Sequence, residues 1–195
     1  MAEFERNADV VWEGSLAEGS GTVSAGSGAF ENLPVSWAAR VERVSRALRE
    51  ASVEARIEEF SEGTPTAEDA ANAVGCDLAE IVKSLLFACD GRWVLAMVPG
   101  DRRADRAKVA AAAGAQKAAV ASAYEVARVT GFEAGGVAPF PLPGVHTVLI
   151  EQTLLARAVL WIGAGTPRHM AALAPGDLVK VSRAQSADLV SENVD

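Results

Sequence analysis

Residues 81–100, IVKSLLFACDGRWVLAMVPG, constrain the fold of this chain more than any other stretch. Two apolar runs flank the pair Asp90-Gly91, and an Asp-Gly pair between apolar runs is a strong signal for a two-residue β-hairpin turn. The stretch therefore predicts two antiparallel strands that run through the core.

Helix and strand patterns alternate around this hairpin. Thr66, Asp77 and Ser122 each stand three residues before an acidic residue, as in a capping box. Asp101 is expected to cap a helix that Gly114 ends. The expected helices cover residues 45–54, 66–74, 77–80, 101–113, 122–130 and 175–181. The expected β segments cover residues 8–42, 55–60, 81–89, 92–99, 117–122, 145–151 and 158–163.

Strands and helices therefore interleave, with hairpins among them, which predicts an α+β fold and not a doubly wound sheet. The 195 residues, half of them apolar, can form one well-packed domain and an appendage. The N-terminal β pattern is too short to bury a core alone. The expected division is a β-rich appendage at residues 1–42 and a main domain at residues 43–195. The appendage could pack on the main domain, pair with a second copy or stay mobile, and homodimer pairing through its strand edges is slightly favoured.

The net charge of −8 is unevenly distributed. Residues 1–82 hold 16 acidic and 6 basic side chains, whereas residues 83–195 hold 10 acidic and 12 basic ones. A basic stretch between Lys83 and Lys117 is either a solvated surface or a contact for a phosphate backbone. Its candidates for nucleic-acid contact are Arg102, Arg103 and Arg106.

Several classes of protein are disfavoured. Two cysteines, Cys76 and Cys89, cannot build a disulfide framework and suit a reducing compartment. The N-terminus resembles no signal peptide, and the longest uncharged run, residues 134–150, is broken by glycine and proline. Metal-ligand spacing, a Walker loop, a dinucleotide fingerprint and a Ser-His-Asp order are absent. The expectation is a cytoplasmic protein with no membrane contact, metal or cofactor.

The stretch AGGVAPFPLPG, residues 134–144, is a candidate site. Gly135 and Gly136 lack Cβ atoms, so their backbone N–H groups can approach a carbonyl oxygen, a carboxylate or a phosphate. Three prolines stiffen the chain that follows. The glycine pair by itself also fits a rigid surface crossover.

Three further features could belong to the same site. A second glycine-rich turn, WIGAGTPRHM at residues 161–170, follows an expected buried strand. His169 follows the glycines of this turn, whereas His146 is expected at an exposed strand position. Lys83 stands where the first hairpin strand begins, and is either a solvated strand end or a cation held over a pocket.

Four separated motifs in this order strongly resemble the YbaK/ProX aminoacyl-tRNA deacylase family, from about Ser45 to Leu189. This family comprises the editing insertion of bacterial prolyl-tRNA synthetase and its free-standing relatives. The motifs are IVKSLLF, VLAMVPGDRRAD, TGFEAGGVAPFPLPG and WIGAGTPRH with the later LAPGDLVKV. The resemblance implies a mixed, largely antiparallel, barrel-like sheet with surrounding helices.

The resemblance also implies hydrolysis of the ester between a wrong amino acid and its tRNA. The family's catalytic lysine matches Lys83, and its glycine loop places Gly136 as the second catalytic position. The common serine of the loop is Ala138 here, so any hydroxyl contact from that position is lost. The implied substrate-binding residues are Ser84, Gly135, Val137, Ala138, Pro139, Phe140, Gly163, Gly165, Thr166, Pro167 and His169.

Ester hydrolysis passes through an oxyanion that aimed backbone N–H groups stabilise. Lys83 could place its charge against the tRNA terminus or polarise the ester, and the nucleophile would be water or a side chain of the substrate. The expected partners are mischarged tRNA and, as a further candidate, an aminoacyl-tRNA synthetase. The alternative is a non-catalytic module of the same fold that holds tRNA or a synthetase.

Residues 10–42 resemble the first strands of OsmC/Ohr-type thiol peroxidases. Only that segment is present, and the redox cysteines of that family lie beyond the point where the match ends. Cys76 and Cys89 do not match them. A peroxide-reducing function is therefore disfavoured.

Overall fold

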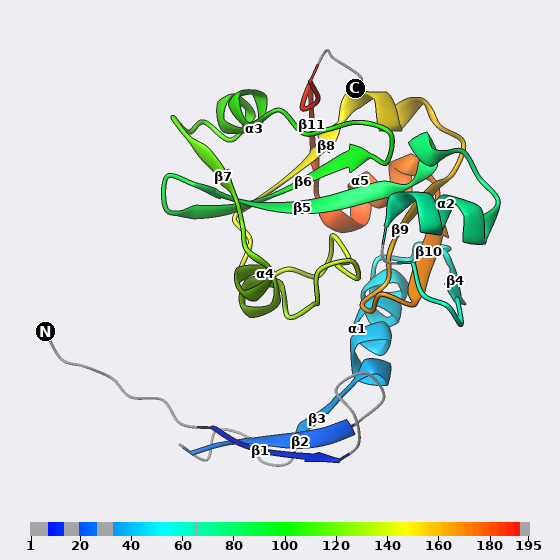
Figure 1. The fold of residues 1–195 in the computed structure, drawn as a ribbon, viewed down its shortest axis with the longest axis vertical. Helices are drawn as coiled ribbons and strands as arrows, with labels where there is room; N and C mark the ends of the chain where they lie inside the picture. The colour runs from blue at the N-terminus through cyan, green and yellow to red at the C-terminus, as the bar shows by residue number, and fades with distance from the viewer. Residues whose placement is uncertain (1–7, 14–19, 27–32, 65, 192–195) are drawn as a thin grey trace, which may run out of the picture.

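The central sheet carries the expected hairpin. The computed structural model describes residues 8–13, 20–26, 33–64 and 66–191 (Figure 1). Strands β5 (Val82–Cys89) and β6 (Arg92–Pro99) pair antiparallel over their whole length. Asp90 and Gly91 have φ values of 47° and 80°, the left-handed conformations that a tight hairpin turn needs. The hairpin prediction is confirmed.

Three further strands complete this sheet, and three others form a second one. The central sheet has the order β11-β8-β6-β5-β7, with β11 (Gln185–Ala187), β8 (Thr147–Glu151) and β7 (Ala118–Val120). Strand β8 is parallel to β6 and β11, whereas the other pairs are antiparallel. An antiparallel sheet joins β4 (Arg56–Glu59), β10 (His169–Leu173) and β9 (Leu160–Gly163). A bridge between Ile81 and Trp161 connects the two sheets.

The mixed, antiparallel-rich α+β fold is confirmed, but the expected barrel-like closure is not. Within the described residues the strands form open sheets. The helices are α1 (Trp37–Glu50), α2 (Ala67–Val74), α3 (Arg106–Ala112), α4 (Ala123–Thr130) and α5 (Pro175–Ser182), with 3₁₀ helices at Leu78–Glu80 and Gln152–Ala156. The hydroxyls of Thr66 and Ser122 accept from the N–H groups of Asp69 and Glu125, which confirms both expected caps.

Three sequence-based expectations about elements are wrong. Helix α3 starts at Arg106, because the carboxylate of Asp105 and not that of Asp101 caps it, accepting from the N–H groups of Ala107 and Lys108. Residues 37–42 belong to helix α1 and not to a β segment. Strands β10 and β11 were missed, because their sequences, HMAAL and QSA, have no clear alternating pattern.

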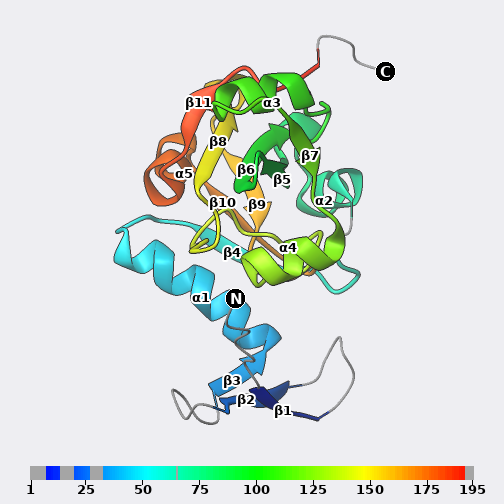
Figure 2. The ribbon, with the colours of Figure 1, turned by 90° about the vertical axis from the view of Figure 1, so that its left-hand side faces the viewer.

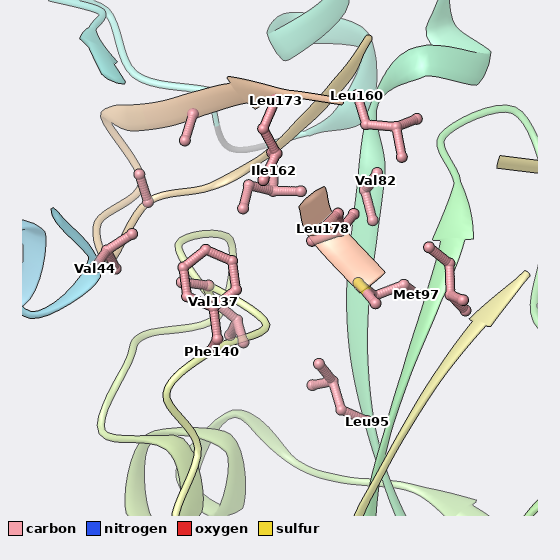
Figure 3. Close-up of a cluster of buried hydrophobic side chains, with 14 of the residues drawn as sticks. Val44, Val82, Leu95, Met97, Val137, Phe140, Leu160, Ile162, Leu173 and Leu178 are labelled. Carbon is pink, nitrogen blue, oxygen red and sulfur yellow. The ribbon is translucent and has the colours of Figure 1, made fainter. Parts of the chain in front are cut away.

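The largest hydrophobic cluster lies where α1, the loop after α4 and both sheets meet. Figure 3 shows Val44 of α1 close to Val137 and Phe140 of that loop, with Ile162 of β9 in the same cluster. All four side chains are buried. The loop is therefore anchored by its own apolar side chains, and not only by its prolines.

The N-terminal strands form a separate antiparallel sheet, β1 (Ala8–Glu13), β2 (Ser20–Ala25) and β3 (Leu33–Ser36). In both views it lies apart from the two larger sheets, and α1 leads from it to them (Figures 1 and 2). The neighbours Val10 and Val11 are 60% and 64% exposed. Because successive strand residues point to opposite faces, β1 is uncovered on both.

Deleting residues 1–36 should leave a folded chain, because α1 keeps Val44 and Leu48 in the core. We expect a single cooperative thermal transition within about 4 °C of the full chain. Sedimentation should give a monomer, and a larger species for the full chain if the N-terminal sheet pairs with a second copy.

Deleting residues 1–42 is the matched comparison. The expected domain boundary lies inside α1, so this deletion removes its first turns and should lower the melting temperature further. An insoluble or unfolded product from the shorter deletion would show that the N-terminal sheet belongs to the core.

Candidate active site

A cavity of about 270 Å³ opens beside the start of β5. It brings together residues from three separated sequence motifs. The expected site residues in its wall are Lys83, Ser84, Gly135, Val137 and Gly163. Sequence reasoning missed the others, which are Thr64, Thr66, Ala67, Ala70, Ile81, Val82, Leu85 and Met170.

Lys83 is held at the edge of this cavity by the turn that follows β6. Its Nζ donates to the backbone carbonyl oxygens of Gly100, at 2.9 Å, and of Arg102. Partial burial lowers the pKa of Lys83 below its usual value, although the nearby carboxylates of Glu68 and Asp101 oppose this shift. An ammonium group has three N–H donors, so two carbonyls leave one donor for a ligand.

Ser84 follows Lys83 in β5 and is among the residues around the cavity. Its Oγ atom is buried and has no hydrogen-bond partner among the described residues. The hydroxyl of Thr64 donates to the carbonyl of Pro167 at 3.1 Å, and that of Thr66 to a carboxylate oxygen of Asp69 at 2.7 Å. Of these three hydroxyls, only that of Ser84 has no hydrogen bond among the described residues, and it is closed off from solvent.

Gly136 joins the two glycine-rich loops. Its carbonyl accepts from the N–H of Gly165 at 3.0 Å, and a Cβ atom at position 136 would lie 2.4 Å from the carbonyl carbon of Thr166. Its own N–H donates to the carbonyl of Glu133 at 3.0 Å. This differs from the sequence-based expectation, because the Gly136 N–H is already bonded and Gly136 acts through its lack of a side chain.

Other N–H groups of the same loop remain available. Those of Gly135, Val137 and Ala138 have no acceptor among the described residues. Gly135 has a φ of 89°, and both Gly135 and Val137 line the cavity. Because Val137 and Phe140 point into the core (Figure 3), the backbone between them is fixed.

Thr166, Pro167 and His169 support the second loop and are not among the residues that line the cavity. Thr166 Oγ1 lies 2.7 Å from His169 Nδ1 and accepts from the N–H of Arg168. His169 Nε2 lies 3.9 Å from a carboxylate oxygen of Glu59. Burial lowers the pKa of His169 below its usual value, although the nearby carboxylate of Glu59 opposes this shift.

The other expected residues lie around the cavity and not in its wall. Ala138 is buried, and Gly165 packs against α1. Pro139 and Phe140 line a separate groove between α1, their own loop and the end of α5. The three candidate arginines lie in the turn after β6 and at the start of α3, with the side chains of Arg103 and Arg106 exposed.

The cysteines do not have the properties of redox thiols. Burial, with the nearby carboxylates of Glu80 and Asp77, raises the pKa of Cys76 to about 11. Burial also raises the pKa of Cys89. A reactive thiol needs a lowered pKa, so the chemistry disfavours peroxide reduction.

The described residues contain no group of three or more His, Cys, Asp or Glu side chains that could hold a metal. They also contain no helix long and apolar enough to cross a membrane.

The fold and the site define a mixed α+β domain with a cavity between a lysine-bearing hairpin strand and two glycine-rich loops. The chain belongs to the aminoacyl-tRNA editing domain family, whose profile matches residues 61–181. This confirms the resemblance to the YbaK/ProX family. No curated protein matches the chain.

Solved structures share the fold. A proposed trans-editing enzyme for prolyl tRNA synthetase is 32% identical with a TM-score of 0.71, over 78% of this chain and 97% of that chain. Hypothetical protein APE2540 is 28% identical with a TM-score of 0.72, over 76% of this chain and 99% of that one. A structure from a study of epitope grafting onto scaffold proteins by computational design is 32% identical with a TM-score of 0.72, over 78% and 97%.

Gly136→Ala should destabilise the protein by about 2 kcal/mol in urea unfolding, because the new Cβ meets backbone atoms that cannot move aside cheaply. Gly176→Ala is the matched control, since no atom lies within 4 Å of a Cβ there. Because the position is exposed and helical, Gly176→Ala should raise the free energy of unfolding by up to about 1 kcal/mol. Equal stabilities for the two variants would mean that the loops are not in the contact described.

Proposed function

We propose that this protein hydrolyses the ester bond of mischarged aminoacyl-tRNA and acts in trans, apart from the synthetase. The observation that carries the proposal is the cavity in which Lys83, Ser84 and the unpaired N–H groups of the glycine loop meet. Membership of the aminoacyl-tRNA editing domain family supports it. So does the likeness to a proposed trans-editing enzyme for prolyl tRNA synthetase.

The reaction begins when a water molecule adds to the ester carbonyl carbon and forms a tetrahedral oxyanion. The bond to the ribose oxygen then breaks, and the proton lost by water goes to that oxygen. The products are a free amino acid and a tRNA with a free terminal hydroxyl. A nucleophilic side chain on the bound amino acid could replace the water in the first step.

The N–H groups of Gly135 and Val137 are the donors for the oxyanion, because they line the cavity and lack an acceptor among the described residues. Preorganised donors of this kind are among the largest contributions to catalysis of acyl transfer. The third donor of Lys83 polarises the ester carbonyl or binds the terminal ribose or phosphate. Ser84 Oγ contacts the aminoacyl group.

The tRNA would approach over the turn that follows β6. Arg102, Arg103 and Arg106 lie in this turn and at the first position of α3, and the carbonyl of Arg102 accepts a hydrogen bond from Lys83. A phosphate there would be close to the cavity edge. A tRNA substrate fits the cytoplasmic location expected from the sequence, and a synthetase that releases the mischarged tRNA is the second proposed partner.

A non-catalytic module that only holds tRNA or a synthetase is the alternative. Such a module would need a tRNA-binding surface but no unpaired N–H groups inside a cavity. The N–H groups of Gly135 and Val137, which lack an acceptor among the described residues and belong to lining residues, therefore favour hydrolysis. A wild-type protein that binds mischarged tRNA without deacylating it would favour the alternative.

Lys83→Ala should lower the deacylation rate by roughly 10²- to 10³-fold, the usual loss when one transition-state donor is removed. A panel of mischarged tRNAs, with release of the amino acid as the readout, measures this. Lys117→Ala is the control. Lys117 is exposed and directly precedes β7, whose Ala118 pairs with Cys89 at the opposite end of β5 from Lys83. Wild-type turnover by a correctly folded Lys83→Ala variant would remove Lys83 from the site.

Replacing Arg102, Arg103 and Arg106 by alanine should weaken tRNA binding at low salt and flatten its salt dependence. Each lost phosphate contact lowers the slope of log K against log salt by about 0.7–0.9. Binding titrations at several salt concentrations give this slope. If the triple variant keeps the wild-type affinity and slope, these arginines are only solvated surface.

A further inference from the structure

Helix α1 contacts both glycine-rich loops of the site, although it lies outside the residues 61–181 that match the editing-domain family. Figure 2 shows α1 running beneath the second sheet and toward α4. Two arginines one turn apart, Arg40 and Arg43, make the contacts. Neither was a candidate from the sequence.

Arg43 connects the end of α4 to the first glycine-rich loop, residues 134–144. Its Nη2 donates to the carbonyl of Thr130 at 2.6 Å and to that of Pro141 at 3.3 Å. The guanidinium lies 3.8 Å from the centre of the Phe132 ring. Gly131 leaves the space for it, because a Cβ atom there would be 2.9 Å from Arg43 Nη1. One side chain thus fixes the segment that contains the oxyanion donors.

Arg40 contacts Glu133, directly before the first loop, and the backbone of the second loop. Its Nη1 lies 3.0 Å from Oε1 of Glu133, the residue whose carbonyl accepts from the Gly136 N–H. A Cβ atom at Gly165 would be 2.9 Å from the carbonyl oxygen of Arg40. The first turns of α1 therefore fit against both loops where they meet.

We infer that Arg43, assisted by Arg40, is a positioning residue that holds the glycine loop in the geometry needed for ester hydrolysis. The inference rests on the proposed function for its catalytic consequence, but the anchoring itself is independent of it. Neither arginine lines the cavity, so they act on the substrate only through the loop backbone. Displacement of such a loop by about 1 Å can lower a rate 10²-fold.

The test compares Arg43→Gln with Arg46→Gln in the full chain. Arg46 is an exposed residue on the same helix with no contact partner among the described residues. Hydrogen exchange should become at least about tenfold faster at the amides of Phe132 and Gly136 in Arg43→Gln, and stay unchanged at Leu86 and Leu95 of the hairpin. Arg46→Gln should change neither set.

The kinetic measurement uses the same two variants and adds Arg43→Lys. Arg43→Gln should lower kcat roughly 10- to 100-fold with little change in KM, because the loop donors act in the transition state. Arg43→Lys should recover part of the loss, since an ammonium group can reach the carbonyls but cannot stack on Phe132 as a planar guanidinium does.

Three results would overturn the inference. They are unchanged loop exchange in Arg43→Gln, equally faster exchange in the hairpin, or faster loop exchange with an unchanged kcat. If the wild type shows no deacylation, the proposed function fails and the exchange comparison alone decides whether Arg43 anchors the loop.

Discussion

The close contact between two glycine-rich loops is the constraint on which the site depends. Gly136 and the backbone of Thr166 approach so closely that no side chain fits between them. The hydrogen bond from the N–H of Gly165 to the carbonyl of Gly136 then fixes the position of one loop relative to the other. Because Val137 and Phe140 are buried beside this contact, the backbone between them is held in place.

The opposite wall of the cavity is equally rigid. The β5–β6 hairpin runs through the core, and the turn after β6 supplies the carbonyl oxygens that hold Lys83. Lys83 of β5 and Gly135 and Val137 of the glycine loop thus line the same cavity. Donors fixed in this way would stabilise the oxyanion of the ester hydrolysis proposed above without rearrangement.

The sequence was enough to predict those parts of the fold that depend on interactions between residues close together in the chain. The Asp90-Gly91 turn, the caps at Thr66 and Ser122 and the glycine loops all depend on a few neighbouring residues. The predicted start of α3 was wrong because two aspartates four residues apart, Asp101 and Asp105, both fit the pattern of a helix cap. The cavity wall from α2 and β10 could not be predicted, because Ala70 and Met170 have no property that marks them as lining residues. The role of Arg43 depends on contacts across about 90 residues of chain.

The most direct measurement is a crystal structure of the protein with an amide-linked analogue of aminoacyl-adenosine, which cannot be hydrolysed at the ester position. The account predicts the analogue's carbonyl oxygen within hydrogen-bonding distance of the N–H groups of Gly135 or Val137. Its aminoacyl group should contact Ser84 Oγ, and Lys83 should keep its bonds to the turn. An analogue bound elsewhere, with the cavity between β5 and the glycine loop left empty, would contradict the account.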